Sequence, residues 1–323
     1  ETLCSQAGID TRVIDESRHG FSAILAKLVA ICRAVKPDII HAHRYKENLL
    51  AAIAAMACGR PRLITTVHGL SEGMNSTFKG MMKSALNRFL MRRMFDMTVA
   101  VSNDIAISLS ERSGVPSKRL ATIVNGIDVH NGFPKKTRTL VDTFTIGSAG
   151  RLFPVKDFSI MVDIARMTCA ARTKARFVLA GDGPEKDAIF HKIRTNGLED
   201  HFTLLGHVDD MQDFYAGLDI YINTSIHEGI PMTVLEAMAR RIPVVAFAVG
   251  GLNEIVSHGH DGYLVQHRDA GEFSQYLIEL IDDRDRLQRF GDNAGSTVHK
   301  RFSTTRMTES YCSAYVRLLG TRS

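Results

Sequence analysis

The 323-residue sequence has no apolar run long enough to cross a membrane. Its richest apolar stretch, Leu49 to Ala57, falls well short of the ~20 residues that a spanning helix needs. A signal peptide, a fixed-period repeat and a low-complexity tract are also not visible. A charged fraction of 23% and a hydrophobic fraction of 45% are typical of a globular protein in water.

Cysteine is also scarce, with five residues in the whole chain. They are scattered, odd in number and never spaced as Cys-x-x-Cys: Cys4, Cys32, Cys58, Cys169 and Cys312. This pattern argues against a disulfide framework and a zinc site, and it favours reduced thiols in the cytoplasm.

Charge is divided unevenly along the chain. Residues 1–141 contain 20 Lys and Arg against 11 Asp and Glu, whereas the remainder contains 20 against 24. The length suits two ordinary domains. A basic half and an acidic half therefore suggest that one domain faces an anionic partner.

Short apolar segments alternate with helical stretches in the first half of the chain. We expect strands at Asp38–Ala42, Arg62–Val67, Met97–Val101 and Ala121–Val124. We expect helices between them, near Lys46–Ala57, Ser76–Met94 and Asn103–Ser113. Residues Leu3 to Asp10 resemble the tail of a helix running into a strand, so we expect the natural N-terminus to lie further upstream.

A second series of strands follows, at Phe144–Ala149, Arg176–Gly181, Thr203–Gly206, Asp219–Asn223, Pro243–Ala248 and Gly262–Val265. Such alternation predicts parallel sheets with helices on both faces. Two series predict two Rossmann-like doubly wound α/β domains, over residues 1–138 and 139–305, with the polar segment Asn131–Asp142 as linker. Residues 306–323 would form a C-terminal helix, which we expect to pack back on the first domain.

The most informative segment runs from His227 to Met238. Two carboxylates, Glu228 and Glu236, stand eight residues apart around a Gly-x-Pro turn that opens a helix. Free backbone N–H groups at a helix start favour a phosphate. One carboxylate would then reach a sugar hydroxyl and the other a ribose hydroxyl. A capped amphipathic helix with two solvated glutamates remains the alternative from spacing alone.

Other strand ends of the second series carry suitable residues, since ligands of open α/β sheets sit beyond the carboxyl ends of strands. Gly150 and Arg151 end the first strand, and Lys156 follows. These cations would neutralise a diphosphate, although surface ion pairing is the alternative for each alone. Gly181 and Asp182 follow the next strand in a tight turn. His207 and Val208 follow another strand, and their backbone is placed to read a base edge. The run Gly250 to Glu254 stands at a further strand end.

Three histidines of the first series stand at strand ends. His68 would face the inter-domain cleft and either stabilise charge or hydrogen-bond a sugar hydroxyl, unless it is a structural residue of a turn. His41 and His43 flank another strand end, and His43 is the better placed to face the cleft. No third ligand follows, so we predict no metal site. Asp283 and Asp285 form a DxD pattern inside a charged helical run, which we interpret as a solvated face.

The stretch from Phe78 to Phe95 interleaves basic and apolar residues. Basic amphipathic helices of this kind bind anionic membrane surfaces. A core-packed helix with a basic outer face is the alternative. We predict no nucleic-acid partner, because no recognition motif accompanies the charge.

Taken in order, these motifs resemble the retaining GT-B glycosyltransferases of the large group 1 (family 4-like) class, which build bacterial polysaccharides and glycolipids. The matching blocks cover nearly the whole chain. They begin at Lys36–His43, Thr65–Gly69, Val99–Ser102, Asn125–Asp128 and Gly150–Leu152 with Lys156, and continue at Gly181–Pro184, the Glu228/Glu236 block, Gly250–Gly251 with Glu254–Val256, and Asp261–Val265. The family's N-terminal Gly-rich loop, which helps to position donor and acceptor, has no counterpart in these residues.

The resemblance implies roles for individual residues. Arg151 and Lys156 would hold the donor diphosphate, Glu236 the ribose and Glu228 the donor sugar. The backbone of Gly229, Ile230, Pro231, Met232 and Thr233 would support phosphate and sugar. His68 would line the reaction centre.

The implied reaction moves a hexosyl or N-acetylhexosaminyl group from a nucleoside diphosphate sugar, UDP- or GDP-linked, to a glycan or lipid-linked acceptor with retention. No cofactor or metal would be required, because cationic side chains and a helix N-terminus supply the positive charge. We expect a cytoplasmic protein, peripheral on the inner face of the membrane if Phe78–Phe95 docks there. A nucleotide-sugar epimerase and a non-catalytic nucleotide-sugar-binding module remain as alternatives.

Overall fold

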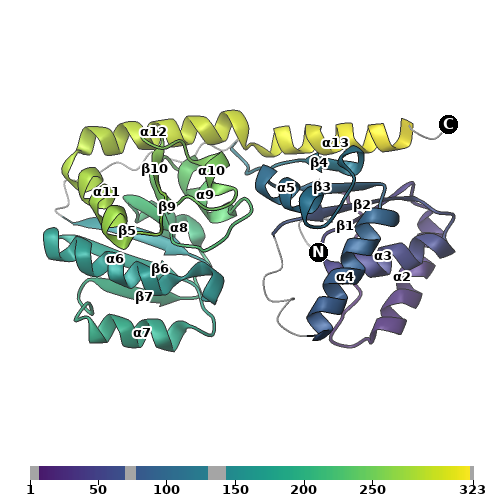
Figure 1. Ribbon diagram of the computed structural model, residues 1–323, viewed down its shortest axis with the longest axis horizontal. Helices are drawn as coiled ribbons and strands as arrows, with labels where there is room; N and C mark the ends of the chain where they lie inside the picture. Colours follow the sequence, from purple (N-terminus) through teal and green to yellow (C-terminus); the bar gives the residue numbers. More distant parts are fainter. Residues whose placement is uncertain (1–6, 70–77, 130–142, 321–323) are drawn as a thin grey trace.

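Two parallel β-sheets form the centres of two α/β domains (Figure 1). The structure is a computed structural model that describes residues 7–69, 78–129 and 143–320. The linker expected at Asn131–Asp142 lies outside these residues. No helix of the described part is both long and apolar enough to cross a membrane.

The first sheet contains four parallel strands in the order β1-β2-β3-β4. Their bounds are Ile39–Ala42, Arg62–Val67, Met97–Ala100 and Leu120–Thr122. Ile64, Met97 and Val99 are at most 2% exposed. Apolar runs of this kind are typical of parallel strands, which are covered on both faces.

The second sheet contains six parallel strands in the order β10-β9-β8-β5-β6-β7. In chain order they are β5 (Phe144–Ala149), β6 (Ala175–Ala180), β7 (Phe202–Gly206), β8 (Ile220–Asn223), β9 (Val244–Phe247) and β10 (Gly262–Val265). The strand order reverses between β5 and β8. In open α/β sheets the crevice outside the carboxyl ends at such a reversal is where ligands bind.

Helices cover both sheets. The first domain has α2 (Phe21–Val35), α3 (Tyr45–Ala57), α4 (Phe78–Arg93), α5 (Asn103–Glu111) and a 3₁₀ turn at Ser117–Arg119. The second has a 3₁₀ turn at Pro154–Lys156 and then α6 (Phe158–Ala171), α7 (Lys186–Thr195), α8 (Met211–Ala216), α9 (Met232–Ala239), α10 (Leu252–Ile255), α11 (Ala270–Asp282) and α12 (Arg284–Arg301). Residues of α6, α7 and α11 share one core cluster, and those of α9, α10 and α12 share another.

The predicted fold class is confirmed, and all ten predicted strands are present with ends shifted by at most two residues. One expectation is wrong: residues 7–20 contain turns and no strand, so Ile9 does not begin one. Residues 1–6, where the preceding helix tail was expected, are not described. Helix α2, which the motif analysis did not identify, follows this segment directly.

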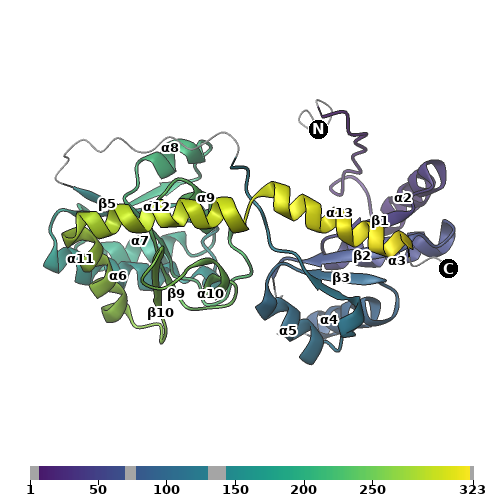
Figure 2. The same ribbon diagram turned by 90° about the horizontal axis from the view of Figure 1, so that it is seen from above.

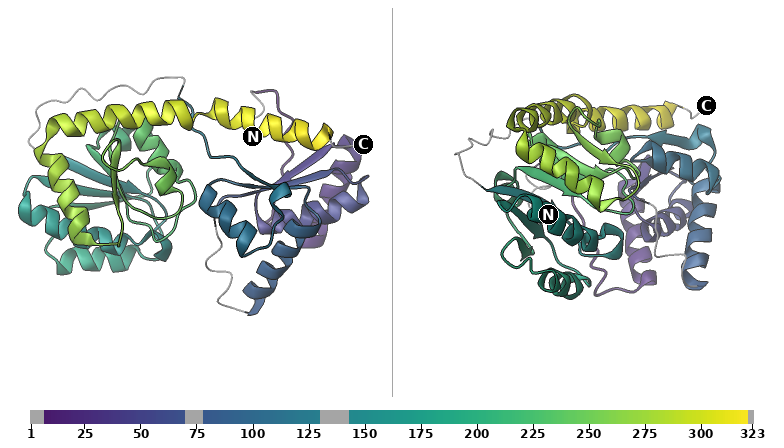
Figure 3. Two further views of the ribbon diagram at one scale, coloured as in Figure 1. Left: turned by 45° about the horizontal axis from the view of Figure 1, so that its top comes forward. Right: turned by 60° about the vertical axis from the view of Figure 1, so that its left-hand side comes forward.

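Helix α13 (Thr304–Gly320) continues from α12 and crosses from the second domain to the first (Figures 1 and 2). Figure 3 shows α12 over the six-stranded sheet and α13 over the four-stranded one. Ala314 and Leu318 are buried in one cluster with Ile64, Met97 and Val99 of the first sheet. The last helix of the chain therefore belongs to the core of the first domain.

His41 ties α13 to the first sheet. Its Nδ1 lies 2.7 Å from the hydroxyl of Tyr315, and its Nε2 lies 2.8 Å from Oγ1 of Thr66. Burial, and then the neighbouring His43 and His68, lower the pKa of His41 to about 4. A proton on this ring would place a positive charge in a half-buried position beside two other histidines.

We expect His41 to make stability pH-dependent on the acid side. Its folded pKa is about 4 and its ordinary value is 6.5. The unfolded chain therefore binds more protons between these values, and stability is lost as the pH falls from 6.5 towards 4. Wild type should lose free energy of unfolding between about pH 7 and about pH 5. After allowance for solvent screening, this loss should be smaller by about 1 kcal/mol in His41→Gln.

The measurement is urea unfolding of both proteins at the two pH values. His267→Gln, which changes an exposed histidine of the second domain, is the matched control. An equal acid-side loss in wild type and His41→Gln would contradict the assignment.

Candidate active site

Lys156 and Glu228 form an ion pair beyond the carboxyl ends of β5 and β8. Lys156 Nζ lies 2.5 Å from Glu228 Oε1, and the two side chains are 27% and 10% exposed. The same Oε1 accepts hydrogen bonds from the Ser225 hydroxyl at 2.6 Å and Asn223 Nδ2 at 3.4 Å. No described residue donates to Oε2, so this oxygen is available to a ligand. The pair stands at the strand-order reversal, where the fold places a binding crevice.

Backbone contacts join the two loops that carry this pair. The Thr224 hydroxyl donates to the Lys156 carbonyl at 3.0 Å, and the Ile226 N–H donates to the Val155 carbonyl at 2.8 Å. The side chain of Asn223 accepts the Ser225 N–H at 3.1 Å and shapes the turn that leads to Glu228. Sequence reasoning overlooked Asn223, Thr224 and Ser225, although three polar residues directly after a buried strand were the available signal.

Glycine at position 229 allows the two domains to meet. A Cβ on Gly229 would lie 2.4 Å from the carbonyl oxygen of His68 and 3.3 Å from Val101, both in the first domain. On the other side, a Cβ on Gly251 would lie 1.8 Å from the Gly229 carbonyl oxygen. The backbone after Glu228 is therefore enclosed by backbone from both domains. A side chain at Gly229 would push the domains apart, and one at Gly251 would displace the Gly229 peptide.

Glu236 is held by a tyrosine of another helix. Tyr215, in α8, donates its hydroxyl hydrogen bond to Glu236 Oε2 at 2.7 Å. Burial, and then Tyr221 and Glu236, raise the pKa of Tyr215, so the phenol keeps its proton. Pro231 precedes the first turn of α9, and no described residue accepts a hydrogen bond from the N–H groups of Met232 and Thr233. Helix α9 thus carries Glu236 and begins with two amides that have no acceptor among the described residues.

Several predicted residues make no contact with the Lys156/Glu228 pair. Arg151 is exposed, with its guanidinium 5.0 Å from the ring centre of Phe153. Asp182 is paired with Lys186 at 3.0 Å, an interaction that lowers the pKa of Asp182. His207 is paired with Asp209 at 3.2 Å, and Val208 beside it is half-buried. A Cβ on Gly181 would lie 1.9 Å from the Gly150 carbonyl oxygen, so Gly181 serves packing between strand ends.

His68 enters the site from the end of β2 and is paired with His43. Nδ1 of His43 lies 3.1 Å from Nε2 of His68, and the two rings are stacked at 5.4 Å. Partial burial, followed by the neighbouring His43 and Arg44, lowers the pKa of His68. A neutral ring near pH 7 favours the hydrogen-bonding role for His68 over the charge-stabilising one.

A carboxylate of the second domain caps a helix of the first. Glu254 Oε1 accepts the Asn103 N–H at 2.7 Å and the Asp104 N–H at 3.3 Å, and Oε2 accepts from Asn103 Nδ2 at 2.9 Å. These amides open α5, where the helix dipole favours a negative charge. Nearby, Asn125 Nδ2 donates to the Ile230 carbonyl at 3.1 Å. Glu254 was quoted in a motif, but its contact with the other domain was not foreseen.

Residues considered as metal ligands serve other purposes in the described part of the chain. His41 uses both ring nitrogens on Tyr315 and Thr66. Asp283 caps α12 by accepting the Arg286 N–H at 2.9 Å. Within residues 7–69, 78–129 and 143–320, no group of three His, Cys, Asp or Glu is placed to hold a metal ion.

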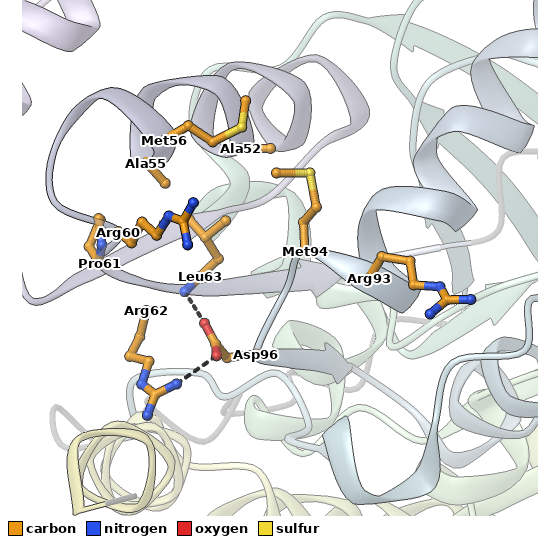
Figure 4. A pocket seen from close by; sticks show the side chains of 10 residues that line it. All are labelled: Ala52, Ala55, Met56, Arg60, Pro61, Arg62, Leu63, Arg93, Met94 and Asp96. Atoms are coloured by element: carbon orange, nitrogen blue, oxygen red, sulfur yellow. Dashed lines mark hydrogen bonds and ion pairs between the residues drawn. The ribbon is translucent and has the colours of Figure 1, made fainter. Parts of the chain in front are cut away.

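A cavity of about 710 Å³ lies at the opposite edge of the first sheet, where β2 and β3 begin (Figure 4). Arg62 and Asp96 form an ion pair at 2.9 Å in its wall, and Asp96 also accepts the Leu63 N–H at 2.8 Å. None of the predicted site residues lines this cavity. The carboxyl edge of the sheets therefore remains the candidate site.

Comparison with protein families gives two matches that together span most of the chain. Residues 132–297 match the family described as Glycosyl transferases group 1, and residues 8–131 match Glycosyltransferase Family 4. The chain is 26% identical to an N-acetyl-alpha-D-glucosaminyl L-malate synthase of Bacillus anthracis, over 92% of this chain and 79% of that protein. It is also 26% identical to a UDP-Gal:alpha-D-GlcNAc-diphosphoundecaprenol alpha-1,3-galactosyltransferase of Escherichia coli, over 87% and 80%.

The fold is shared with solved structures. The crystal structure of HepE from Anabaena in complex with UDP-glucose superposes with a TM-score of 0.84. It is 23% identical to this chain, and the match covers 98% of this chain and 88% of that one. This likeness supports the two-domain GT-B architecture.

We expect Glu254 to hold the first turn of α5 against the second domain. Glu254→Gln keeps one acceptor oxygen but removes the charge, and should weaken the contact by about 1 kcal/mol. Amide hydrogen exchange at Asn103 and Asp104 should therefore become several-fold faster. Asp210→Asn is the control, because Asp210 caps α8 within the second domain. Unchanged exchange at α5 in Glu254→Gln would show that the carboxylate does not carry this contact.

Proposed function

The chain belongs to the group 1 glycosyl transferases, and from this premise we propose that it transfers a hexosyl or N-acetylhexosaminyl group from a UDP- or GDP-sugar with retention of configuration. The acceptor in this proposal is a glycan or a lipid-linked glycan of bacterial polysaccharide or glycolipid synthesis. The observation that carries it is the Lys156/Glu228 pair at the strand-order reversal. The next residue, Gly229, meets the backbone of His68 of the other domain. The proposed location is cytoplasmic, with the first domain at the inner membrane surface.

The proposed donor site rearranges an ion pair that already exists. Lys156 would turn its ammonium group from Glu228 to the diphosphate, assisted by Arg151 and by the free amides that open α9. Glu228 would then accept a hydroxyl hydrogen bond from the donor sugar while Ser225 continues to donate to it. Glu236, steadied by Tyr215, would accept from the ribose. Gly181, Asp182, His207 and Val208 would border the base.

The proposed chemistry relies on cations to stabilise the leaving group. Positive charge aimed at the departing diphosphate lowers the barrier most in a site that excludes water. The leaving phosphate would assist the acceptor hydroxyl on the same face of the sugar, which leads to retention. A neutral His68 would orient a hydroxyl at this centre.

The test of the function is a screen of UDP-, GDP- and ADP-sugars, read by release of the nucleoside diphosphate. Release that depends on an acceptor supports the proposal, and NMR coupling constants of the product then decide between retention and inversion. Sugar conversion without an acceptor would identify an epimerase, and binding without turnover a non-catalytic module. Turnover should survive excess chelator.

The two proposed phosphate ligands give a direct prediction. Arg151→Ala and Lys156→Ala should each lower kcat/KM by roughly 30- to 1,000-fold, which corresponds to ~2–4 kcal/mol of lost transition-state stabilisation. Arg172→Ala is the control, because Arg172 is paired with Asp282 outside the site. Turnover of the double variant within about threefold of wild type would refute this assignment.

The outward face of α4 supports docking on an anionic membrane. At about 100° per residue, four exposed side chains fall on one stripe of the helix. They are Phe78 (77% exposed), Met82 (59%), Leu86 (37%) and Phe89 (55%). Of the buried residues, Gly80 and Met91 lie away from this stripe, and Leu90 borders its Leu86 side. The side of α4 that faces solvent is therefore unusually apolar.

Cations flank the apolar stripe on both sides. By the same helical spacing, Lys79 and Lys83 lie along one side of it and Arg88 and Arg92 along the other. Apolar side chains between cationic ones suit the boundary between lipid head groups and acyl chains. Helix α4 is thus the surface that we propose for contact with the membrane that carries the acceptor.

Co-sedimentation with liposomes tests this docking. Each Lys or Arg near an anionic leaflet contributes about 1 kcal/mol, so reversing Lys83, Arg88 and Arg92 to Glu should lower binding by about 100-fold or more. Binding of wild type should rise with anionic lipid and fall with salt. Reversal of the exposed Arg166, Arg194 and Arg289 of the second domain is the matched control.

Donor turnover should persist in the α4 triple variant. Pelleting of this variant at the wild-type level would mean that α4 is not the docking surface. Replacing Phe78 and Phe89 by Ser separates the apolar contribution to binding from the electrostatic one, because this change removes apolar contact and keeps every charge.

A further inference from the structure

Arg268 adopts a backbone conformation that is unfavourable for any residue with a side chain. It stands between β10 and α11 with φ +52°. The left-handed region is normally occupied by glycine, since a Cβ crowds the neighbouring carbonyl there. The contacts of the Arg268 side chain therefore decide whether this strain accompanies a function.

The side chain of Arg268 reaches across the end of β9 to two loops. Its guanidinium lies 4.5 Å from the ring centre of Phe247, the last residue of β9. Nη2 forms an ion pair with Asp157, and Nη1 donates to the carbonyl oxygens of Ser225 at 2.8 Å and Thr224 at 3.3 Å. The Arg268 and Asp157 side chains are 29% and 27% exposed, so solvent screens this contact only in part.

Both loops carry a residue of the proposed donor site. Asp157 directly follows Lys156 and is itself left-handed, with φ +44°. Ser225 donates to the Glu228 carboxylate through its hydroxyl while its carbonyl accepts from Arg268. One planar guanidinium thus contacts the chain one residue after Lys156 and three residues before Glu228. Because the guanidinium is planar and rigid, donors on two of its nitrogens fix the direction as well as the distance between the loops.

We propose that Arg268 is a positioning residue that sets the spacing and orientation of Lys156 and Glu228 for the donor diphosphate and sugar. This role rests on the proposed function, since it acts through the donor site. Arg268 makes no side-chain contact with Lys156 or Glu228 themselves. Its removal should leave both groups in place but let their loops move relative to each other, and small displacements of catalytic groups are costly in rate.

Arg268→Gly is the decisive variant, because glycine removes the guanidinium and relieves the backbone strain at once. We expect the melting temperature to change little while kcat/KM falls roughly 10- to 100-fold, mostly in kcat. Arg268→Lys keeps the charge without the fork and should recover part of the loss. A fall in melting temperature with unchanged kcat would show a structural brace only and overturn the proposal.

The chain offers a matched control in Arg241. This residue also has a left-handed backbone, with φ +59°, and an ion pair with Asp292 at 3.2 Å. It follows α9 at the edge of the sheet opposite the donor loops. Arg241→Gly should leave kcat/KM within about twofold of wild type. An equal loss in both variants would assign the effect to strain relief or general loosening, and would refute a specific role of Arg268.

Hydrogen exchange separates this proposal from the proposed function. Amides of residues 155–157 and 224–228 should exchange several-fold faster in Arg268→Gly and at the wild-type rate in Arg241→Gly, whatever the enzyme turns over. Faster exchange without nucleotide-sugar turnover in wild type would leave Arg268 as the loop clamp and reject the function. Unchanged exchange in Arg268→Gly would reject the clamp even in an active enzyme.

Discussion

The enclosure of the Gly229 peptide is the constraint on which the site depends. Backbone of His68 approaches it from the first domain and backbone of Gly251 from the second, and neither leaves room for a Cβ. Because His68 belongs to the end of β2 and Glu228 precedes Gly229, this contact sets how the two sheets present their carboxyl ends to each other. The Glu254 cap on α5 and the Asn125 bond to Ile230 add to the same interface. The arrangement of the two domains therefore determines the geometry of the candidate site.

The charged side chains of the candidate site are already held by hydrogen bonds from neighbouring residues. Lys156, Ser225 and Asn223 all converge on one oxygen of Glu228, and Tyr215 occupies one oxygen of Glu236. Each carboxylate keeps a second oxygen to which no described residue donates. A diphosphate sugar would thus exchange partners with a formed network, which costs less reorganisation than building one. The short loops after β5 and β8, joined by the Thr224 contact with Lys156, hold that network in place.

The sheets could be predicted from the sequence because a buried parallel strand is a short run of apolar residues, which can be recognised without knowledge of distant contacts. The bounds of Phe144–Ala149 and Gly262–Val265 were predicted to the residue. Lys156, Glu228 and Glu236 were proposed as site residues from strand-end position and spacing, and this assignment stays a prediction. Contacts between distant segments were not accessible in this way. Nothing local shows that Tyr215 reaches Glu236, or that Glu254 caps α5. Arg268 is the clearest example, because neither its left-handed backbone nor its reach to Asp157 follows from its neighbours in the sequence. The strand expected near Ile9 was wrong for the converse reason, since a short apolar pair without a pairing partner does not make a strand.

The path of α13 bears on how the protein is made. Ile64, Met97, Val99 and Ile123 are synthesised early, yet Ala314 and Leu318, which cover them, follow the whole second domain in the chain. Until then, one face of the first sheet is exposed to solvent, and the second domain is already free to fold. The first domain consequently completes its core after the second, against the usual N-terminal-first order. Nascent chains that stop before about residue 310 would present an apolar sheet face to chaperones, because the helix that covers this face has not yet been made.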